Sequence, residues 1–155
     1  MTKRSVQHAT IVVERTYDAA PARVFAAWSD KDALLRWGNP GETWDNGYER
    51  FDFRVGGQDI SWFGPRGGER FTNVTYYQDI VQDERIIMAG TMDRDGTRIF
   101  SGLTTVEFKQ SGNGCHLVMT EQSAFLDGGD LPENHKAGWT DMLENLALEV
   151  DSKRA

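Results

Sequence analysis

The stretch from Pro132 to Val150 is the feature that most constrains the fold, because it predicts one long amphipathic helix. Pro132 suits the first helical turn, and Glu133 places a negative charge where the helix dipole favours it. Such a helix runs for roughly five turns, about 28 Å. Its inward stripe begins at His135 and continues through Trp139, Met142, Leu143, Leu146 and Val150. A helix with one apolar face requires another element to cover that face.

The chain before this helix predicts mainly strands and turns. Residues 9–17 are rich in β-branched side chains and indicate a first strand. A short apolar helix follows Pro21, and Ser29 or Asp30 can cap a second short helix that ends near Trp37. From about Trp44 the apolar residues recur with a period of two, and turns rich in Gly and Asp separate them. The further strands are expected at 50–55, 60–63, 71–80, 85–92, 98–109 and 115–125.

Short turns between successive strands predict an antiparallel meander, since parallel strands need long crossovers. The predicted class is α+β: a curved seven-stranded antiparallel sheet around the long C-terminal helix, with two short helices after the first strand. Residues 1–155 are expected to form a single domain. A curved sheet has more concave surface than one helix covers, so we expect a cavity between helix and sheet.

The net charge and the cysteine content limit which binding partners and which cellular compartment we expect. The net charge of −7 disfavours nucleic acid and anionic membranes as partners. Cys115 is the single cysteine, which excludes an internal disulfide and favours a reducing compartment. The basic N-terminal residues precede no apolar signal segment, and no window approaches the ~20 apolar residues of a membrane span. We therefore expect a soluble, cytoplasmic protein. The sequence leaves open whether it forms a homodimer.

The sequence predicts no metal site and no cofactor. His8, His116 and His135 are far apart, and neither Cys-x-x-Cys nor His-Glu-x-x-His occurs. Residues 93–96, Asp-Arg-Asp-Gly, fit a hairpin turn better than a calcium loop. The glycines of residues 112–114 precede no helix, so they do not indicate a dinucleotide site.

Arg15 and Glu121 form the first candidate site. If the first and last strands are neighbours in the sheet, these two charges can pair across them. Inside a pocket, the pair would bind a polar ligand group or orient a proton-transfer residue. The alternative is a charge pair at the rim or on the outer face, because a one-residue shift in register reverses every side chain.

His135 is the centre of the second candidate site. Histidine titrates near neutral pH, so His135 and Glu121 are the candidates for acid–base catalysis. The alternative is that His135 only packs on the apolar stripe of the last helix. Aromatic and apolar residues on the expected inner faces complete the set. The candidate ligand-binding residues are Arg15, Tyr48, Trp62, Tyr77, Met92, Glu121, His135 and Trp139.

Several short motifs resemble one known family in their order and spacing. These motifs are Arg15-Thr16-Tyr17 before Ala20-Pro21, Val24-Phe25-Ala26-Ala27-Trp28, Leu34-Leu35-Arg36-Trp37, Gly56-Gly57 and Gly138-Trp139. Over roughly residues 8–150 the chain resembles the START-like (SRPBCC, helix-grip, Bet v 1-like) domains related to the Hsp90 ATPase activator. The resemblance implies the helix-grip fold. It implies no single activity, because the superfamily includes lipid carriers, polyketide cyclases, plant ligand-binding proteins and co-chaperone domains.

Binding of a small apolar or amphipathic molecule in the cavity is the function that the sequence favours, since it requires only this fold and a pocket. One alternative is a cyclase- or isomerase-type enzyme that uses the same cavity. Another is a co-chaperone-like interaction domain with a chaperone partner, although the eukaryotic activator has a separate N-terminal domain for which this chain leaves no room. We expect a neutral or singly anionic ligand, held by Arg15 or Arg50 if either points inward.

Overall fold

The structure is a computed structural model that describes residues 3–151. Within these residues the chain forms seven strands and three helices. Their bounds are β1 Val6–Tyr17, α1 Pro21–Ser29, α2 Lys31–Trp37, β2 Trp44–Arg50, β3 Gln58–Pro65, β4 Phe71–Val81, β5 Arg85–Arg94, β6 Thr97–Ser111, β7 Gly114–Leu126 and α3 Pro132–Val150. This arrangement confirms the predicted α+β class, with two short helices after the first strand and one long helix at the C-terminal end.

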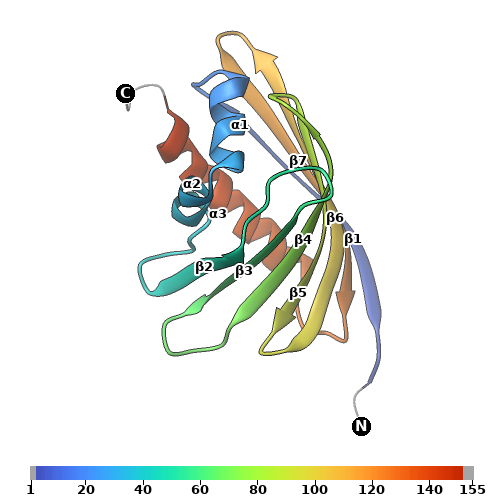
Figure 1. Cartoon of the computed structure of the whole chain (residues 1–155). Coiled ribbons are helices and arrows are strands. Elements are labelled where there is room, and N and C mark those ends of the chain that lie inside the picture. Colours follow the sequence, from blue (N-terminus) through green and yellow to red (C-terminus); the bar gives the residue numbers. More distant parts are fainter. Residues whose placement is uncertain (1–2, 152–155) are drawn as a thin grey trace.

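The sheet is antiparallel throughout and has the order β1-β7-β6-β5-β4-β3-β2. The strands β2 to β7 form the predicted meander, and the last strand, β7, pairs with the first strand, β1. Figure 1 shows the sheet curving around α3, with α1 and α2 beside one end of that helix. The curvature leaves a concave face that α3 crosses, and this face carries both the core and the candidate site.

The apolar stripe of α3 divides between a packed core and a more open region. Leu143, Leu146 and Val150 are at most 1% exposed, and the Tyr17 hydroxyl donates a hydrogen bond of 2.7 Å to the backbone oxygen of Leu143. Trp139, earlier on the same stripe, is only partly buried. Full burial stabilises an aliphatic side chain by ~1.5–3 kcal/mol, so the C-terminal half of α3 supplies most of the helix's apolar burial.

The prediction of a strand at residues 50–55 is wrong, because β2 ends at Arg50 and residues 51–57 form a loop. Gly56 adopts a positive φ of 83°, a conformation that favours glycine. The loop is attached to β4 by two backbone hydrogen bonds. The Gly56 N–H donates to the Tyr77 carbonyl oxygen, and the Tyr77 N–H donates to the Gly57 carbonyl oxygen. Phe53 packs its ring against that of Tyr77 at 4.9 Å between centroids. The alternating aromatic residues therefore anchor a loop, although their spacing indicated a strand.

Local signals account for most of the other boundaries. The Asp30 side chain accepts a hydrogen bond of 3.1 Å from the Asp32 backbone N–H at the start of α2, as predicted for a cap. Asp95 and Gly96 form the tight turn between β5 and β6 with φ of 48° and 84°. No helix within residues 3–151 is long and apolar enough to cross a membrane.

Candidate functional site

A pocket of about 540 Å³ lies between α3 and the concave face of the sheet. Most of its walls are aromatic or aliphatic, with contributions from all three helices and from β2 to β7. Three of its lining residues are exposed, namely Pro40 after α2 and Asn134 and Asp141 on α3, and they mark its mouth. Both the volume and the apolar walls are typical of a small-molecule site.

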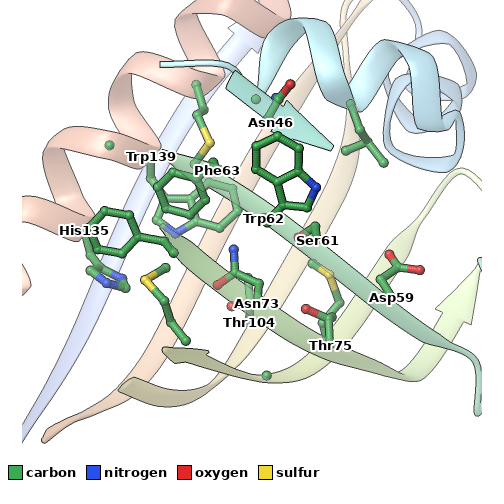
Figure 2. Close-up of a pocket in the computed structure, with 18 of the residues that line it drawn as sticks. Asn46, Asp59, Ser61, Trp62, Phe63, Asn73, Thr75, Thr104, His135 and Trp139 are labelled. Carbon is green, nitrogen blue, oxygen red and sulfur yellow. The ribbon is translucent and has the colours of Figure 1, made fainter. Parts of the chain in front are cut away.

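The floor of the pocket carries a band of short polar side chains. Ser61 on β3, Asn73 and Thr75 on β4, and Thr104 on β6 line the pocket, and Figure 2 shows them between Asp59 at one end and His135 at the other. Alternation along each strand places them on the inner face. Across residues 3–151, none of these four side chains hydrogen-bonds another protein group; their donors and acceptors are therefore free to bind a ligand.

Glu121 occupies one end of the pocket and is 4% exposed. Its Oε1 lies 2.9 Å from Nδ1 of His135 and accepts a bond of 3.3 Å from the Ser123 hydroxyl. Its Oε2 accepts a bond of 2.9 Å from the indole N–H of Trp139. The other ring nitrogen of His135, Nε2, lies 2.8 Å from Oδ2 of Asp130. The imidazole thus bridges a strand carboxylate and a carboxylate from the loop before α3.

His135 is held in its protonated form by this arrangement. Burial by itself would lower the pKa of His135, but hydrogen bonds and charges from Asp130 and Glu121 outweigh it and raise the pKa to about 9. The ring also stacks on Phe100, with 4.6 Å between centroids. An imidazolium whose two N–H groups are both donated has no lone pair, so this geometry does not favour a general base.

The expected pair between Arg15 and Glu121 does not form. The register of β1 on β7 aligns Arg15 with Leu117, whereas Glu121 is aligned with Ile11. Arg15 Nη1 instead lies 3.5 Å from Oε2 of Glu144 on α3. Arg15 is therefore separated from Glu121 by four positions along the strand, and it does not line the pocket formed by the described residues.

Arg50 does not support the expected anion site either. It is exposed at the end of β2, and its Nη1 donates a weak bond of 3.4 Å to Gln58. Like Arg15, it is absent from the walls of the pocket in the described part of the chain. The interior consequently lacks the two arginines on which an anionic ligand was expected to depend.

Asp59 on β3 lies at the opposite end of the pocket from His135, the partner of Glu121 (Figure 2), and is 5% exposed. It accepts hydrogen bonds from the Tyr77 hydroxyl and, at 2.9 Å, from the Asp52 backbone N–H. Burial raises the pKa of the Asp59 carboxyl above its ordinary value, against the lowering effect of these two bonds. The Tyr48 phenol is close enough for the charge of Asp59 to add to the burial that raises the pKa of Tyr48.

Sequence reasoning missed Asp59 and the polar band on the floor. The signal was present in the alternation of β3, where Asp59, Ser61 and Phe63 share one face. It was also present in β4, where Asn73 and Thr75 share a face with aromatic residues. Polar residues flanked by aromatic ones on an inner face indicate a lined cavity, because a packed core would exclude them.

The structure brings most of the predicted ligand-binding residues to one pocket. Those that line it are Tyr48, Trp62, Tyr77, Met92, Glu121, His135 and Trp139. The Trp62 indole, however, covers Gly47, where an added Cβ would lie 2.8 Å from its Nε1. The Arg70 guanidinium lies 4.3 Å from the centroid of the Trp62 ring. Trp62 therefore makes contacts with Gly47 and Arg70 in addition to lining the pocket with the other six residues.

Three tryptophans close the helical side of the pocket. Trp28 on α1 stacks on Trp139 at 6.0 Å between centroids and 15° between planes, and it packs against Trp37 on α2 at 4.8 Å. Trp37 Nε1 donates to the backbone oxygen of Ala27 at 3.0 Å. The contacts between these rings join all three helices into one wall of the pocket.

No group of His, Cys, Asp and Glu within residues 3–151 has the arrangement of a metal site.

Comparison with solved structures identifies close relatives of this fold. A protein from Rhizobium leguminosarum is 38% identical, with a TM-score of 0.88 over 99% of this chain and 100% of that chain. A protein from Rhizobium loti is 41% identical, with a TM-score of 0.83 over 94% of this chain and 99% of that chain. The AHSA1-like protein from Aeromonas hydrophila, at 24% identity, a TM-score of 0.71 and 92% coverage of each chain, shows the likeness of the fold.

Comparison with curated proteins gave no match. The family described as activator of Hsp90 ATPase homolog 1-like protein matches residues 18–151, which include all three helices and β2 to β7. These residues also contain nearly all of the motifs on which the START-like resemblance rested. The chain therefore belongs to the family of activator of Hsp90 ATPase homolog 1-like proteins.

Proposed function

We propose that the protein binds a small apolar or amphipathic molecule in the pocket between α3 and the sheet. The observation that carries this proposal is a cavity of about 540 Å³ inside a domain of this size. Protein interiors are normally close-packed, with few voids larger than a water molecule. A cavity of this volume therefore represents apolar surface that an occupant would remove from water, which is the dominant favourable term in ligand binding.

The two sides of the pocket suggest how such a molecule lies. The side formed by α3 and the aromatic residues, including Trp139 and Met142, offers apolar contact. The floor offers hydroxyl groups and the amide of Asn73, which supplies both a donor and an acceptor. A ligand with an apolar body and polar groups along one edge fits both surfaces. The unpaired floor side chains would then gain the hydrogen bonds that they lack in the protein alone.

The alternative functions depend on other features. A cyclase or isomerase needs a positioned acid or base, and His135 is committed to two carboxylates. A chaperone-directed role is suggested by the family description, which refers to activation of the Hsp90 ATPase. That role would use the outer surface and would leave the pocket dispensable. Small-molecule binding differs from it in one testable respect, since it is lost when the pocket is filled.

The test uses two substitutions at adjacent positions of β6. Thr104→Phe places a ring in the pocket, whereas Thr105→Phe places the same ring on the other face of the strand. Hydrophobic dyes, fatty acids and polycyclic aromatic compounds are titrated while tryptophan fluorescence is recorded. We expect binding to the wild type and to Thr105→Phe, and a loss of at least about tenfold in affinity in Thr104→Phe. Equal binding by both variants, or no binding to the wild type, would overturn the proposal.

A further inference from the structure

The charged residues of the pocket are unequally divided between the two signs. Four carboxyl groups line it, those of Asp59, Glu121, Asp130 and Asp141, and His135 is the one cationic side chain that lines it within the described residues. No lysine or arginine of residues 3–151 is among the lining residues. Clefts lined by one sign of charge between apolar walls concentrate ions of the opposite sign. The interior is therefore matched in sign to a cation.

The carboxyl groups differ in whether the protein neutralises them. Glu121 and Asp130 share the positive charge of His135. Asp141 is exposed at the mouth, where water solvates it. Asp59 is buried, and in the described part of the chain it has no cationic partner; the nearby Asp52 carboxylate instead adds repulsion. Its two hydrogen bonds, from Tyr77 and the Asp52 backbone, come from uncharged donors.

A buried carboxylate without a counter-ion is costly, because apolar surroundings replace its hydration and no opposite charge compensates. Aromatic rings surround this position as well. Phe53 and Tyr77 meet edge to face at 4.9 Å between centroids, and Tyr48 lies within electrostatic reach of Asp59. The faces of aromatic rings attract cations, most strongly where water is excluded. A cation placed beside Asp59 would lie close to a carboxylate and to aromatic rings.

We propose that the pocket takes an organic cation, a molecule with an ammonium group on an apolar body, and that Asp59 is its counter-ion. This inference rests on the proposed function and specifies the chemical class of the ligand. The apolar body lies along the aromatic side toward Trp139, and the ammonium group lies at the end of the pocket formed by β3 and β4. The Glu121 end is already neutralised by His135, so it does not compete for the charge.

Three probes with the same naphthalene body and different head groups test the sign of the charge. They are 2-naphthylmethylamine, 2-naphthylmethanol and 2-naphthoate, titrated at pH 7 with tryptophan fluorescence or calorimetry as the readout. We expect the amine to bind at least about tenfold more tightly than the carboxylate and more tightly than the alcohol. Asp59→Asn should weaken the amine about tenfold and change the alcohol less than about twofold.

A matched control separates the local charge of Asp59 from the overall charge of the protein. Glu84→Gln makes the same change in net charge at an exposed turn between β4 and β5. It should leave the affinities of all three probes within about twofold of the wild type, since Glu84 is exposed to solvent and does not line the pocket. An equal weakening of the amine in Asp59→Asn and Glu84→Gln would overturn the role of Asp59.

The outcomes distinguish this inference from the proposed function. If the alcohol binds but the carboxylate binds as tightly as the amine, the cation inference fails and the pocket function stands. If none of the three probes binds the wild type, the inference fails together with the pocket function. If Asp59→Asn does not fold, ¹³C NMR of the wild-type Asp59 carboxyl carbon replaces it. The amine should then shift that signal and the alcohol should not; an unmoved signal overturns the assignment.

Discussion

The two ends of the pocket each bury a carboxyl group, but the protein compensates them differently. Glu121 and Asp59 are nearly equal in exposure, at 4% and 5%. Glu121 accepts hydrogen bonds from an imidazolium, an indole and a hydroxyl, and one of these donors carries a charge. Asp59 accepts two bonds, and both donors are neutral. Of two equally buried carboxyl groups, one therefore has a charged partner, and the other has only neutral donors among the described residues.

This difference shows that partners matter more than burial when a buried acid is assigned a role. A buried ion pair is stable only when good geometry and further hydrogen bonds offset the loss of hydration. The Glu121 end meets that condition and links α3 to β7. The Asp59 end does not meet it, and for this reason we assign ligand binding to Asp59 and a positioning role to Glu121. Each prediction below tests one side of this contrast.

Glu121→Gln should have the largest effect, a loss of about 3–5 kcal/mol in the free energy of unfolding. The substitution leaves the buried imidazolium of His135 with one carboxylate and weakens the bond to the Trp139 indole. Urea unfolding at pH 7 measures the loss. Glu14→Gln is the control, because Glu14 forms an exposed pair with His116 at 2.9 Å, and it should cost at most about 1 kcal/mol. Equal losses in the two variants would remove the contrast between a buried and an exposed pair.

Leu143→Ala should cost about 2–5 kcal/mol through lost burial and the cavity that remains. Both ends of the pocket depend on α3 lying against the sheet, and Leu143 supplies that attachment without any charge. Leu148 on the same helix is 57% exposed, so Leu148→Ala should change stability by less than about 0.5 kcal/mol. Chemical denaturation compares the two variants. A small loss in Leu143→Ala would show that the ion cluster, and not the apolar stripe, holds the helix.

Raising the pH from 7 to 10 should remove about 2–3 kcal/mol that the protonated His135 contributes. The pKa of His135 is about 9 in the folded protein, above its ordinary value of 6.5. Its contribution is therefore complete below about pH 6.5 and is lost as the pH rises through about 9. The measurement is the difference in unfolding free energy between the two pH values. In His135→Gln this part of the loss should be absent, and the same pH dependence in both proteins would contradict the prediction.

Asp59→Asn should have the smallest effect on stability, within about 1 kcal/mol at pH 7. The amide oxygen keeps one of the two acceptors, and the amide NH₂ can donate to the Tyr77 hydroxyl oxygen in place of the other bond. The substitution also removes a buried charge that has no cationic partner within the described residues. The same unfolding experiments apply, and the small change should coexist with weakened binding of the amine probe. A loss comparable to that of Glu121→Gln would show that the two ends are not different in kind.

Much of the fold was predictable because its signals are local. The bounds of α3 follow from Pro132, the helical spacing of its apolar residues and their end at Val150. Tight turns such as Asp95–Gly96 separate the strands of the meander, and a glycine at a positive φ marks the turn. The loop at residues 51–57 departs from this rule, since its aromatic residues alternate like a strand but pack as anchors against neighbouring elements.

The sequence by itself determined the order of the elements, the inward stripe of α3 and the likeness to a helix-grip family, because these depend on residues within a few positions of one another. Only the tertiary structure decided which charges meet. In the register of β1 on β7, Arg15 lies four positions along the strand from the partner of Glu121. The packing of α3 on the sheet instead places His135 beside Glu121. The pairing of a charge depends on atoms from distant segments. The alternation of β3 indicates that Asp59 faces inward, but it does not reveal that Asp59 has no cationic partner among the described residues.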